Sequence, residues 1–217
     1  MTRQTRPSNP LALAVLALLF ERPMHPYEMG LLLKQRNKED SIKLRYGSLY
    51  TVIDLLLKRA LIATKEIERE GRRPERTVYE ITPAGSEELH DWMAELVGMP
   101  AKEYPQFEAA LCLLPILPPD EALALLRQRR KLLEQNIAVL AGQIAGISAQ
   151  NFPPLFLVET EYRLAVMKAE QAFVADLVAR IENGWGPLEL WRGFHQDREA
   201  TLAKLYREYG GAPMSST

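Results

Sequence analysis

Two short β-prone runs interrupt a sequence that is otherwise patterned for helices. Residues 61–67 and 77–81 are rich in Ile, Val, Thr and Tyr, and the segment 70–74 between them contains a glycine, a proline and two arginines. Such runs on either side of a Gly- and Pro-containing loop predict a β-hairpin. The position of this hairpin in the order of the predicted helices limits the folds that the chain can adopt.

Three short helical patterns precede the hairpin. The first, Pro10–Phe20, is apolar almost all round, which is typical of a helix buried against several neighbours. Pro26 suits the first turn of a second helix, which runs to about Asn37. In the third, Tyr46–Ala60, apolar residues recur at three- and four-residue spacings. The sequence therefore predicts three helices joined by short connections.

A fourth helix follows the hairpin. Thr82 is a favoured N-cap, Pro83 suits the first turn, and the pattern ends before Gly98. Three helices, a hairpin and a helix form the order of a winged helix-turn-helix. We therefore expect residues 1–98 to form a winged helix-turn-helix DNA-binding domain.

The apolar run Leu11–Phe20 also imitates a secretory signal, because Arg3 and Arg6 precede it. However, Glu21 and Arg22 follow the run directly, no small-x-small cleavage pattern appears, and the run has half the length that a membrane span needs. We interpret it as a buried core helix of a cytoplasmic protein without a membrane segment, and a signal peptide is the less favoured alternative.

The second half of the chain is patterned for helices throughout. Residues 98–105, with three Gly and Pro residues, mark the boundary. A long helix starts at 118–121, a second follows a break at 151–154, and a last helix holds Leu190 to Leu205. We expect residues 104–210 to form a helical dimerisation domain that also serves as an effector domain, so the whole fold is mainly α with one small hairpin.

Each of the two long helices carries an apolar stripe. On the first, the stripe recurs at alternating four- and three-residue steps, which predicts a coiled-coil seam with Arg130 as its one charged member. Gly142 and Gly146 on this helix are expected at a close helix contact. The stripes must be buried within one chain or against a second copy, and we favour burial between the chains of a homodimer. The predicted dimerisation residues are Leu126, Leu133, Ile137, Leu140, Ile144, Tyr162, Val166, Phe173 and Leu177.

Charge is distributed unevenly along the chain. Residues 1–80 contain 15 Lys and Arg against 10 Asp and Glu (+5), whereas residues 81–217 contain 12 against 18 (−6). This asymmetry suggests that the N-terminal part meets a polyanion. These charge counts taken alone are explained about as well by ordinary charged side chains on a solvated surface as by contact with a polyanion.

The chain has one cysteine, Cys112, in an apolar run. A single cysteine can form neither an intrachain disulfide nor a thiolate metal site, which fits a reducing compartment. We expect Cys112 to be a buried, inert hydrophobe rather than a redox sensor.

The third helix and the hairpin can supply the contacts that duplex DNA offers. A major groove about 12 Å wide admits one helix, whose first turns normally face the base edges. Tyr50 could instead pack in the core, and glutamates near the hairpin weaken its positive charge. From the order of the elements as a whole, the predicted DNA-binding residues are Tyr46, Ser48, Tyr50 and Thr51, with Lys43 and Arg45 before the helix and Arg72, Arg73 and Arg76 at the hairpin.

Three stretches of the sequence resemble the PadR family of transcriptional regulators. Their tandem arrangement is specific, and residues 107–119 with the long helices resemble the virulence-activator-like C-terminal domain of one branch of that family. The stretches are Met24-His25-Pro26-Tyr27-Glu28, then Tyr46-Gly47-Ser48-Leu49-Tyr50 with Leu61-Ile62, and Gly71-Arg72-Arg73-Pro74 leading through Val78-Tyr79 to Ile81-Thr82-Pro83-Ala84-Gly85.

The resemblance implies a sequence-specific regulator, in most members a repressor that a small-molecule effector releases. It implies a homodimer held largely by the C-terminal helices, with both third helices in successive major grooves of a pseudo-palindromic double-stranded operator. By position, it adds Tyr27 to the DNA-facing residues. Pro26 and Thr51 stand where the family usually has Gly and Pro, and Ala60 stands where Gly usually closes the third helix.

An effector site would need an apolar cavity with a few polar groups. Trp92, Trp185 and Trp191 are the candidates for contact with a small apolar or aromatic effector. Tryptophan more often fills a core or an interface, so this assignment competes with a purely structural role.

Nothing in the sequence indicates catalysis. His25, His90 and His195 are far apart in the sequence, and no zinc-helix spacing, phosphate-binding loop or nucleophile elbow occurs, so we expect neither an enzyme nor a metal or cofactor. One rival hypothesis is a winged-helix interaction module that has lost DNA binding, for which Asp54 alone gives too little acidic charge. The other is a small-molecule-binding or modifying protein, which turnover of a ligand would reveal.

Overall fold

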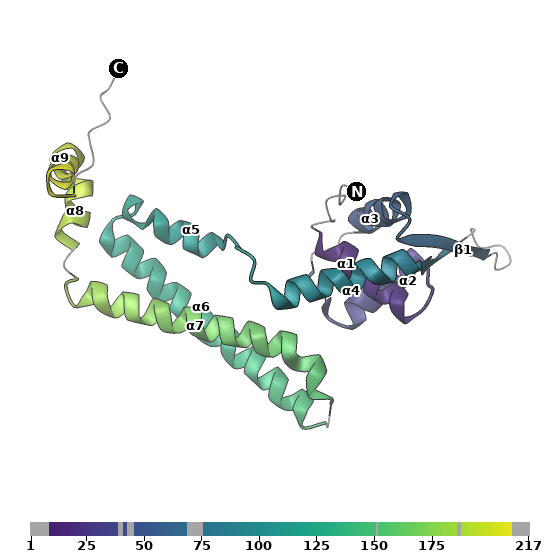
Figure 1. The fold of residues 1–217 in the computed structure, drawn as a ribbon. Coiled ribbons are helices and arrows are strands. Elements are labelled where there is room, and N and C mark those ends of the chain that lie inside the picture. Colours follow the sequence, from purple (N-terminus) through teal and green to yellow (C-terminus); the bar gives the residue numbers. More distant parts are fainter. Residues whose placement is uncertain are drawn as a thin grey trace, which may run out of the picture. The chain divides into compact units, whose positions relative to one another are not determined.

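The structure of the chain is a computed structural model that describes residues 9–38, 41–42, 46–68, 76–150, 152–185 and 188–209. The chain divides into two compact units, Met1–Glu103 and Tyr104–Thr217. Each unit has its own hydrophobic cluster. Figure 1 shows the helices and strands of both units.

The N-terminal unit contains three helices, a hairpin and a fourth helix in that order. This order confirms the predicted winged helix-turn-helix and the mainly helical fold class. The elements are α1 (Pro10–Glu21), α2 (Pro26–Gln35), α3 (Tyr46–Lys58), β1 (Ile62–Glu68), β2 (Arg76–Ile81) and α4 (Pro83–Gly98).

Helix α1 is the centre of this unit, as its all-round apolar pattern predicted. It packs against α3, β2 and α4, and Val15 and Leu16 are fully buried. Met29 of α2, Ile53 of α3 and Ile62 of β1 belong to the same cluster. A helix covered on most sides needs apolar residues on most sides, which explains the sequence pattern.

Side chains cap the starts of three helices in this unit. Asn9 accepts a hydrogen bond from the Leu11 amide at 3.0 Å, and Thr82 accepts one from the Gly85 amide at 3.0 Å. At α2 the acceptor is Nδ1 of His25, which receives the Glu28 amide at 3.2 Å. These caps satisfy amides that lack a partner inside the helix, and each is followed by a proline at the first helical position.

The end of α3 sets the path into the hairpin. Ala60 has φ of 55°, while the Leu61 amide donates to the Leu56 carbonyl at 3.0 Å and the Ala60 amide to the Leu57 carbonyl at 2.9 Å. This is a Schellman-type helix end, in which glycine normally takes the left-handed position. Alanine at position 60, where glycine is usual, therefore keeps the left-handed conformation at the end of α3 but adds backbone strain.

Strands β1 and β2 pair antiparallel, with Ile62 opposite Ile81 and a register shift between Thr64 and Glu66. The start of α4 locks onto this hairpin, because a β-carbon on Gly85 would lie 2.0 Å from the Leu61 carbonyl oxygen. Only glycine allows this approach, so the hairpin and α4 are held together at one point.

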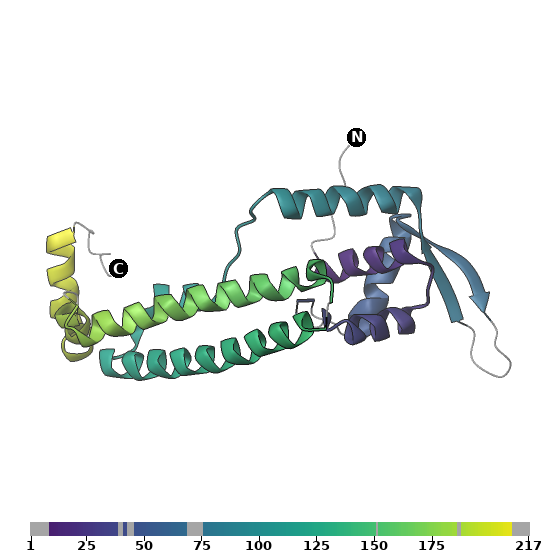
Figure 2. The same cartoon turned by 90° about the horizontal axis from the view of Figure 1, so that it is seen from below.

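All the described secondary-structure elements of the C-terminal unit are helices. Helices α6 and α7 lie side by side as an antiparallel pair (Figures 1 and 2). The elements are α5 (Gln106–Cys112), η2 (Leu114–Ile116), α6 (Pro119–Ser148), η3 (Pro154–Leu157), α7 (Val158–Glu182), α8 (Leu188–Gln196) and α9 (Arg198–Tyr209).

The single last helix expected from the sequence is wrong, because α8 and α9 are separate. Asp197 lies between them, where its side chain accepts the Ala200 amide at 3.0 Å and its carbonyl accepts the Thr201 amide at 3.1 Å. Aspartate is a strong N-cap, so it starts a new helix instead of continuing the old one.

The preference for burying the α6 and α7 stripes between chains needs correction. Leu126 and Leu133 of α6 and Leu177 of α7 are already buried within one chain, together with Val174 and Val178. The short connection between the two helices lets their stripes meet inside the chain. Little surface of these three leucines is left for a second copy.

One further expectation for this unit is wrong, and another, the close helix contact at two glycines, is not met within the single chain. Cys112 is exposed, because Phe107 and Leu111 are the residues of α5 that pack against the cluster. Gly142 and Gly146 make no close helix contact within the chain, since a β-carbon on either would meet nothing within 4 Å. Both glycines therefore lie on a face of α6 that α7 does not cover.

Among the described residues, no helix combines the length and apolar character needed to cross a membrane.

Candidate nucleic-acid interface

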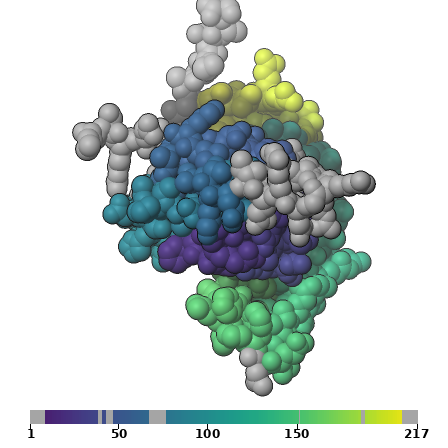
Figure 3. Space-filling view, turned by 90° about the vertical axis from the view of Figure 1, so that its right-hand side faces the viewer, coloured from purple at the N-terminus to yellow at the C-terminus, as the bar shows by residue number. Residues whose placement is uncertain are grey.

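Helix α3 has a buried side and an exposed side. Val52 and Ile53 are buried in the core, whereas Tyr50 is 55% exposed and Thr51 is exposed. Tyr50 therefore does not pack in the core. Figure 3 shows α3, in blue, on the surface of the N-terminal unit. We call the exposed Tyr50 and Thr51 with the half-buried Ser48 the α3 face.

An open hollow of about 480 Å³ adjoins the α3 face. Ser48 and Thr51 line it together with Asn9, Gly47 and Val52. The Thr51 hydroxyl donates to the Gly47 carbonyl at 3.0 Å, which holds the threonine side chain along the helix. The hollow thus joins the start of α1 to the first turns of α3.

The sequence analysis did not single out Asn9 or Gly47. Asn9 could have been noticed as an N-cap before Pro10, since this pair is a common helix start. Its position beside α3 depends on the packing of α1 against that helix, which periodicity alone does not reveal.

Tyr27 lies in the first turn of α2 and is 59% exposed. Its ring stacks on His25, with the ring centroids 6.1 Å apart. His25 is itself held by the Glu28 amide, and the carboxylate of Glu28 pairs with Arg22. The cap and the ion pair therefore fix the backbone from which Tyr27 projects.

The hydroxyl of Tyr79, on β2, has a raised pKa. Burial is the largest cause, the negative charge of Asp54 adds to it, and a hydrogen bond with Thr77 acts in the opposite direction. Tyr79 is therefore neutral at physiological pH. Asp54 is the negative charge that α3 itself contributes on its exposed side.

The basic part of the predicted interface is not placed by the structure. Lys43, Arg45, Arg72 and Arg73 lie outside the described residues, whereas Tyr46 begins α3 and Arg76 begins β2. Contacts from these side chains to DNA stay predictions. Of the predicted DNA-binding set, the described side chains are those of Tyr27, Ser48, Tyr50 and Thr51.

The three tryptophans do not share one site. Trp92 is buried in the core of the N-terminal unit, whereas Trp191 is buried in the C-terminal unit and donates from Nε1 to the Leu117 carbonyl at 2.7 Å. Trp185 is partly exposed, with the Arg180 guanidinium 5.3 Å from its ring centroid. Both buried tryptophans thus fill cores.

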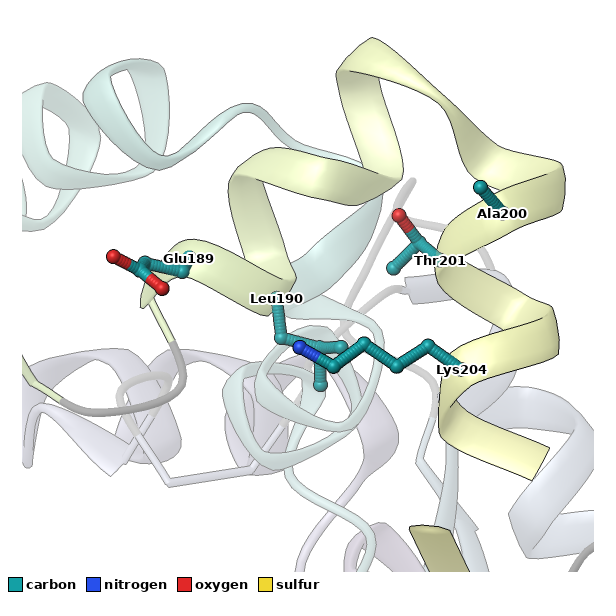
Figure 4. Close-up of a pocket in the computed structure, with 5 residues that line it drawn as sticks. All are labelled: Glu189, Leu190, Ala200, Thr201 and Lys204. Carbon is teal, nitrogen blue, oxygen red and sulfur yellow. The ribbon is translucent and has the colours of Figure 1, made fainter. Parts of the chain in front are cut away.

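A second hollow, of about 290 Å³, lies between α8 and α9. Figure 4 shows its lining, in which the hydroxyl of Thr201 donates to the Asp197 carbonyl at 2.7 Å. Its other lining residues are Glu189, Leu190, Ala200 and Lys204. None of the tryptophans lines it. Within the described ranges, no group of three or more His, Cys, Asp or Glu side chains could hold a metal ion.

Residues 15–91 match the family model "Transcriptional regulator PadR-like family". No curated protein sequence matches the chain.

Several solved structures share the fold. Bacillus subtilis PadR in complex with operator DNA has a TM-score of 0.64 and 19% identity, covering 80% of this chain and 99% of that one. The same protein in complex with p-coumaric acid has a TM-score of 0.64 and 18% identity, covering 79% and 98%. The Vibrio cholerae virulence activator AphA has a TM-score of 0.58 and 15% identity, covering 80% and 98%.

At these identities the similarity to solved structures establishes the fold, and the family model supplies the assignment for the N-terminal unit. The model covers α2, α3, the hairpin and most of α1 and α4. Residues 15–91 are thus similar to the PadR-like family of transcriptional regulators, and the whole chain shares the fold of the solved PadR structures.

Proposed function

We propose that this chain is a homodimeric repressor that binds double-stranded operator DNA through α3 and is released by a small-molecule effector. The observation that carries the proposal is the α3 face, whose polar and aromatic side chains are exposed while the opposite side of the helix is locked in the core. The related fold of Bacillus subtilis PadR has been solved with operator DNA, which supports the same use here.

The α3 face suits base recognition for a physical reason. Ser48, Tyr50 and Thr51 occupy the first turns of a 13-residue helix, the part that normally meets base edges in a helix-turn-helix. Hydroxyl groups can donate to or accept from bases, and an aromatic ring or a threonine methyl can contact a thymine methyl. The packed underside of α3 keeps these groups in place without DNA.

Fluorescence anisotropy with the chain's own promoter region and a scrambled duplex, at several salt concentrations, tests this function. We expect much tighter binding to the promoter and a steep fall in affinity with salt. Thr51→Ala should reduce the preference for the promoter by about 1–3 kcal/mol. Arg72→Ala with Arg73→Ala should weaken both duplexes, whereas Arg198→Ala in α9, which removes one arginine outside the proposed interface, should change neither.

Equal and feeble binding to both duplexes, together with no site found by genome-wide selection, would contradict operator recognition. The winged-helix interaction module would then be the better explanation.

The dimer needs apolar surface that the single chain leaves open. Leu125, Leu132 and Val139 of α6 are 46%, 50% and 62% exposed, and they recur every seventh residue. Gly146 continues this spacing, and nothing in the chain approaches it within 4 Å. A seven-residue repeat of exposed apolar side chains is the pattern of a coiled-coil contact with another helix.

Helix α7 adds a second exposed stripe to this surface. Tyr162, Val166 and Phe173 are exposed, at spacings that place them on one face of the helix. These three predicted dimerisation residues are therefore available to a second copy, unlike Leu126, Leu133 and Leu177. We assign the dimer contact to the exposed stripes of α6 and α7.

Light scattering after size exclusion tests this assignment. Leu132→Glu and Phe173→Glu each place a charge in the proposed contact and should shift the dimer towards monomer, with weaker binding to a full palindromic operator. Lys131→Glu, a neighbouring exposed position on α6, is the control and should stay dimeric. A dimer unaffected by both Glu variants would contradict the assignment.

The effector is proposed to be a small apolar or aromatic molecule, since a related structure contains p-coumaric acid. Addition of p-coumaric acid and other aromatic acids to the protein–promoter complex should identify a compound that lowers its anisotropy without unfolding the protein. Binding of operator DNA implies a cytoplasmic location. If no compound in such a series releases the promoter, control by aromatic acids is excluded.

A further inference from the structure

The hollow beside α3 points to a DNA contact outside the predicted set. We propose that the hollow lined by Asn9, Gly47, Ser48 and Thr51 receives a backbone phosphate of the operator, with the side-chain amide of Asn9 as a donor. This inference rests on the proposed operator-binding function.

The side chain of Asn9 is oriented for this role. Its Oδ1 accepts the Leu11 amide at 3.0 Å, so the oxygen is held by the helix and the Nδ2 end remains as the donor. Asn9 thus links α1, the helix buried most deeply in the unit, to the hollow. A donor on a rigid element needs no reordering when DNA arrives.

The rest of the lining suits a phosphate. Ser48 is half-buried at the hollow and can donate its hydroxyl hydrogen, whereas Thr51 donates its hydrogen to the Gly47 carbonyl and supplies only shape. Asparagine, serine and threonine side chains are common partners of phosphate oxygens in protein–DNA complexes. Among the described residues that line the hollow, none carries a carboxylate that would repel the phosphate.

Space is available at the hollow near Gly47. A β-carbon added to this residue would meet nothing within 4 Å, so the space beside Gly47 is open. Val52 is buried and forms part of the floor. The volume of about 480 Å³ is large enough for a tetrahedral group with its ester oxygens.

The position of the hollow favours DNA over a free anion. Ser48 and Thr51 belong both to the hollow and to the α3 face. The DNA strand that borders the groove occupied by α3 must therefore pass close to this hollow. A phosphate bound there would set the depth of α3 in the groove without reading any base.

Two substitutions at Asn9 separate the phosphate contact from helix capping. Aspartate and serine both cap helices about as well as asparagine, so Asn9→Asp and Asn9→Ser should unfold at the same temperature as the wild type. Asn9→Asp adds a negative charge and should weaken binding to the promoter and to a scrambled duplex by about tenfold each, with a smaller salt slope. Asn9→Ser should weaken both about two- to threefold.

A set of promoter duplexes, each with one neutral methylphosphonate linkage, identifies the phosphate itself. One linkage in each half-site should weaken the wild type, whereas the same linkage should strengthen the binding of Asn9→Asp, because it removes the repulsion between the aspartate and the phosphate. If the wild type fails to bind its promoter, the proposed function fails first. If the wild type binds and Asn9→Asp matches its affinity and salt slope, only the phosphate contact is overturned. A loss confined to the promoter would also overturn it, because a phosphate contact does not distinguish sequences.

Discussion

The two units bury their helices to very different degrees. In the N-terminal unit, seven of the twelve residues of α1 are buried. In the C-terminal unit, four of the thirty residues of α6 and four of the twenty-five of α7 are buried. The first unit closes a core around one helix, whereas the second covers one side of a helix pair and leaves the other side open.

This difference follows from the number of elements that surround each helix. Helix α1 has α3, α4 and β2 around it, so its apolar residues are covered on most sides. In the C-terminal unit, α6 and α7 mainly cover each other. Two helices alone can bury one stripe each, and a further apolar stripe needs another partner. A stable N-terminal unit and a C-terminal unit that depends on a second copy are the expected consequences.

The largest effect is expected in the N-terminal core. Leu16→Ala removes a fully buried side chain in α1 and should lower the free energy of unfolding by about 3–5 kcal/mol, measured by urea denaturation with Trp92 fluorescence as the probe. Phe20→Ala in the same helix removes an exposed ring and should cost far less. Similar losses for both would mean that the closed core does not describe this unit.

A neighbouring leucine pair tests the two sides of α6. Leu133 is 9% exposed and Leu132 is 50% exposed. Leu133→Ala should lower the stability of the C-terminal unit by about 2–4 kcal/mol at any protein concentration. Leu132→Ala should act mainly by weakening the dimer, so the loss should grow as the protein is diluted. Denaturation of both variants at two concentrations distinguishes these outcomes, and identical concentration dependence would contradict the two-sided helix pair.

Of two left-handed helix ends, the one in the well-buried N-terminal unit carries the backbone strain, and the one in the C-terminal unit does not. Ala60 at the end of α3 has φ of 55°, whereas Gly184 after α7 has φ of 74° and the residue type that this conformation favours. Ala60→Gly should raise the melting temperature, with a gain of about 0.5–1 kcal/mol, and Gly184→Ala should lower stability by a similar amount. A destabilising Ala60→Gly would show that the left-handed end of α3 is not strained.

The smallest effect is expected at the surface of the N-terminal unit. Arg36, which follows the end of α2, donates a hydrogen bond to Glu21 of α1 at 2.8 Å, and this bond is the main cause of the lowered pKa of Glu21. A pKa lowered by folding adds stability above the ordinary glutamate value, and this stability is lost as pH falls through the lowered pKa. Glu21→Gln should therefore cost less than about 0.5 kcal/mol at pH 7 and nothing in strong acid.

Denaturation of Glu21→Gln and the wild type from pH 7 down to strong acid checks how the difference in their stability changes with pH. A difference that grows towards acid would contradict it.

Sequence patterns were sufficient to predict most of the helices and strands, with the division between α8 and α9 as an exception, but insufficient to predict which elements pack against one another. Thr82 and Pro83 predicted the start of α4 because capping depends on adjacent residues alone. The exposed stripe through Leu125, Leu132 and Val139 was missed because the buried stripe lies one residue away and is equally apolar. Asn9 was missed because its place beside α3 arises from helix packing.

The sequence by itself determined the order of the elements in the N-terminal unit, the central place of α1 and the resemblance to the PadR family. These features depend on local propensity and on the apolar period within each element. Only the tertiary structure decided which apolar stripe of α6 meets α7, that Tyr50 is exposed, that Cys112 is not buried, and that α1 and α3 share a hollow. Burial is shared between elements distant in the sequence, so a pattern within one element cannot assign its partner.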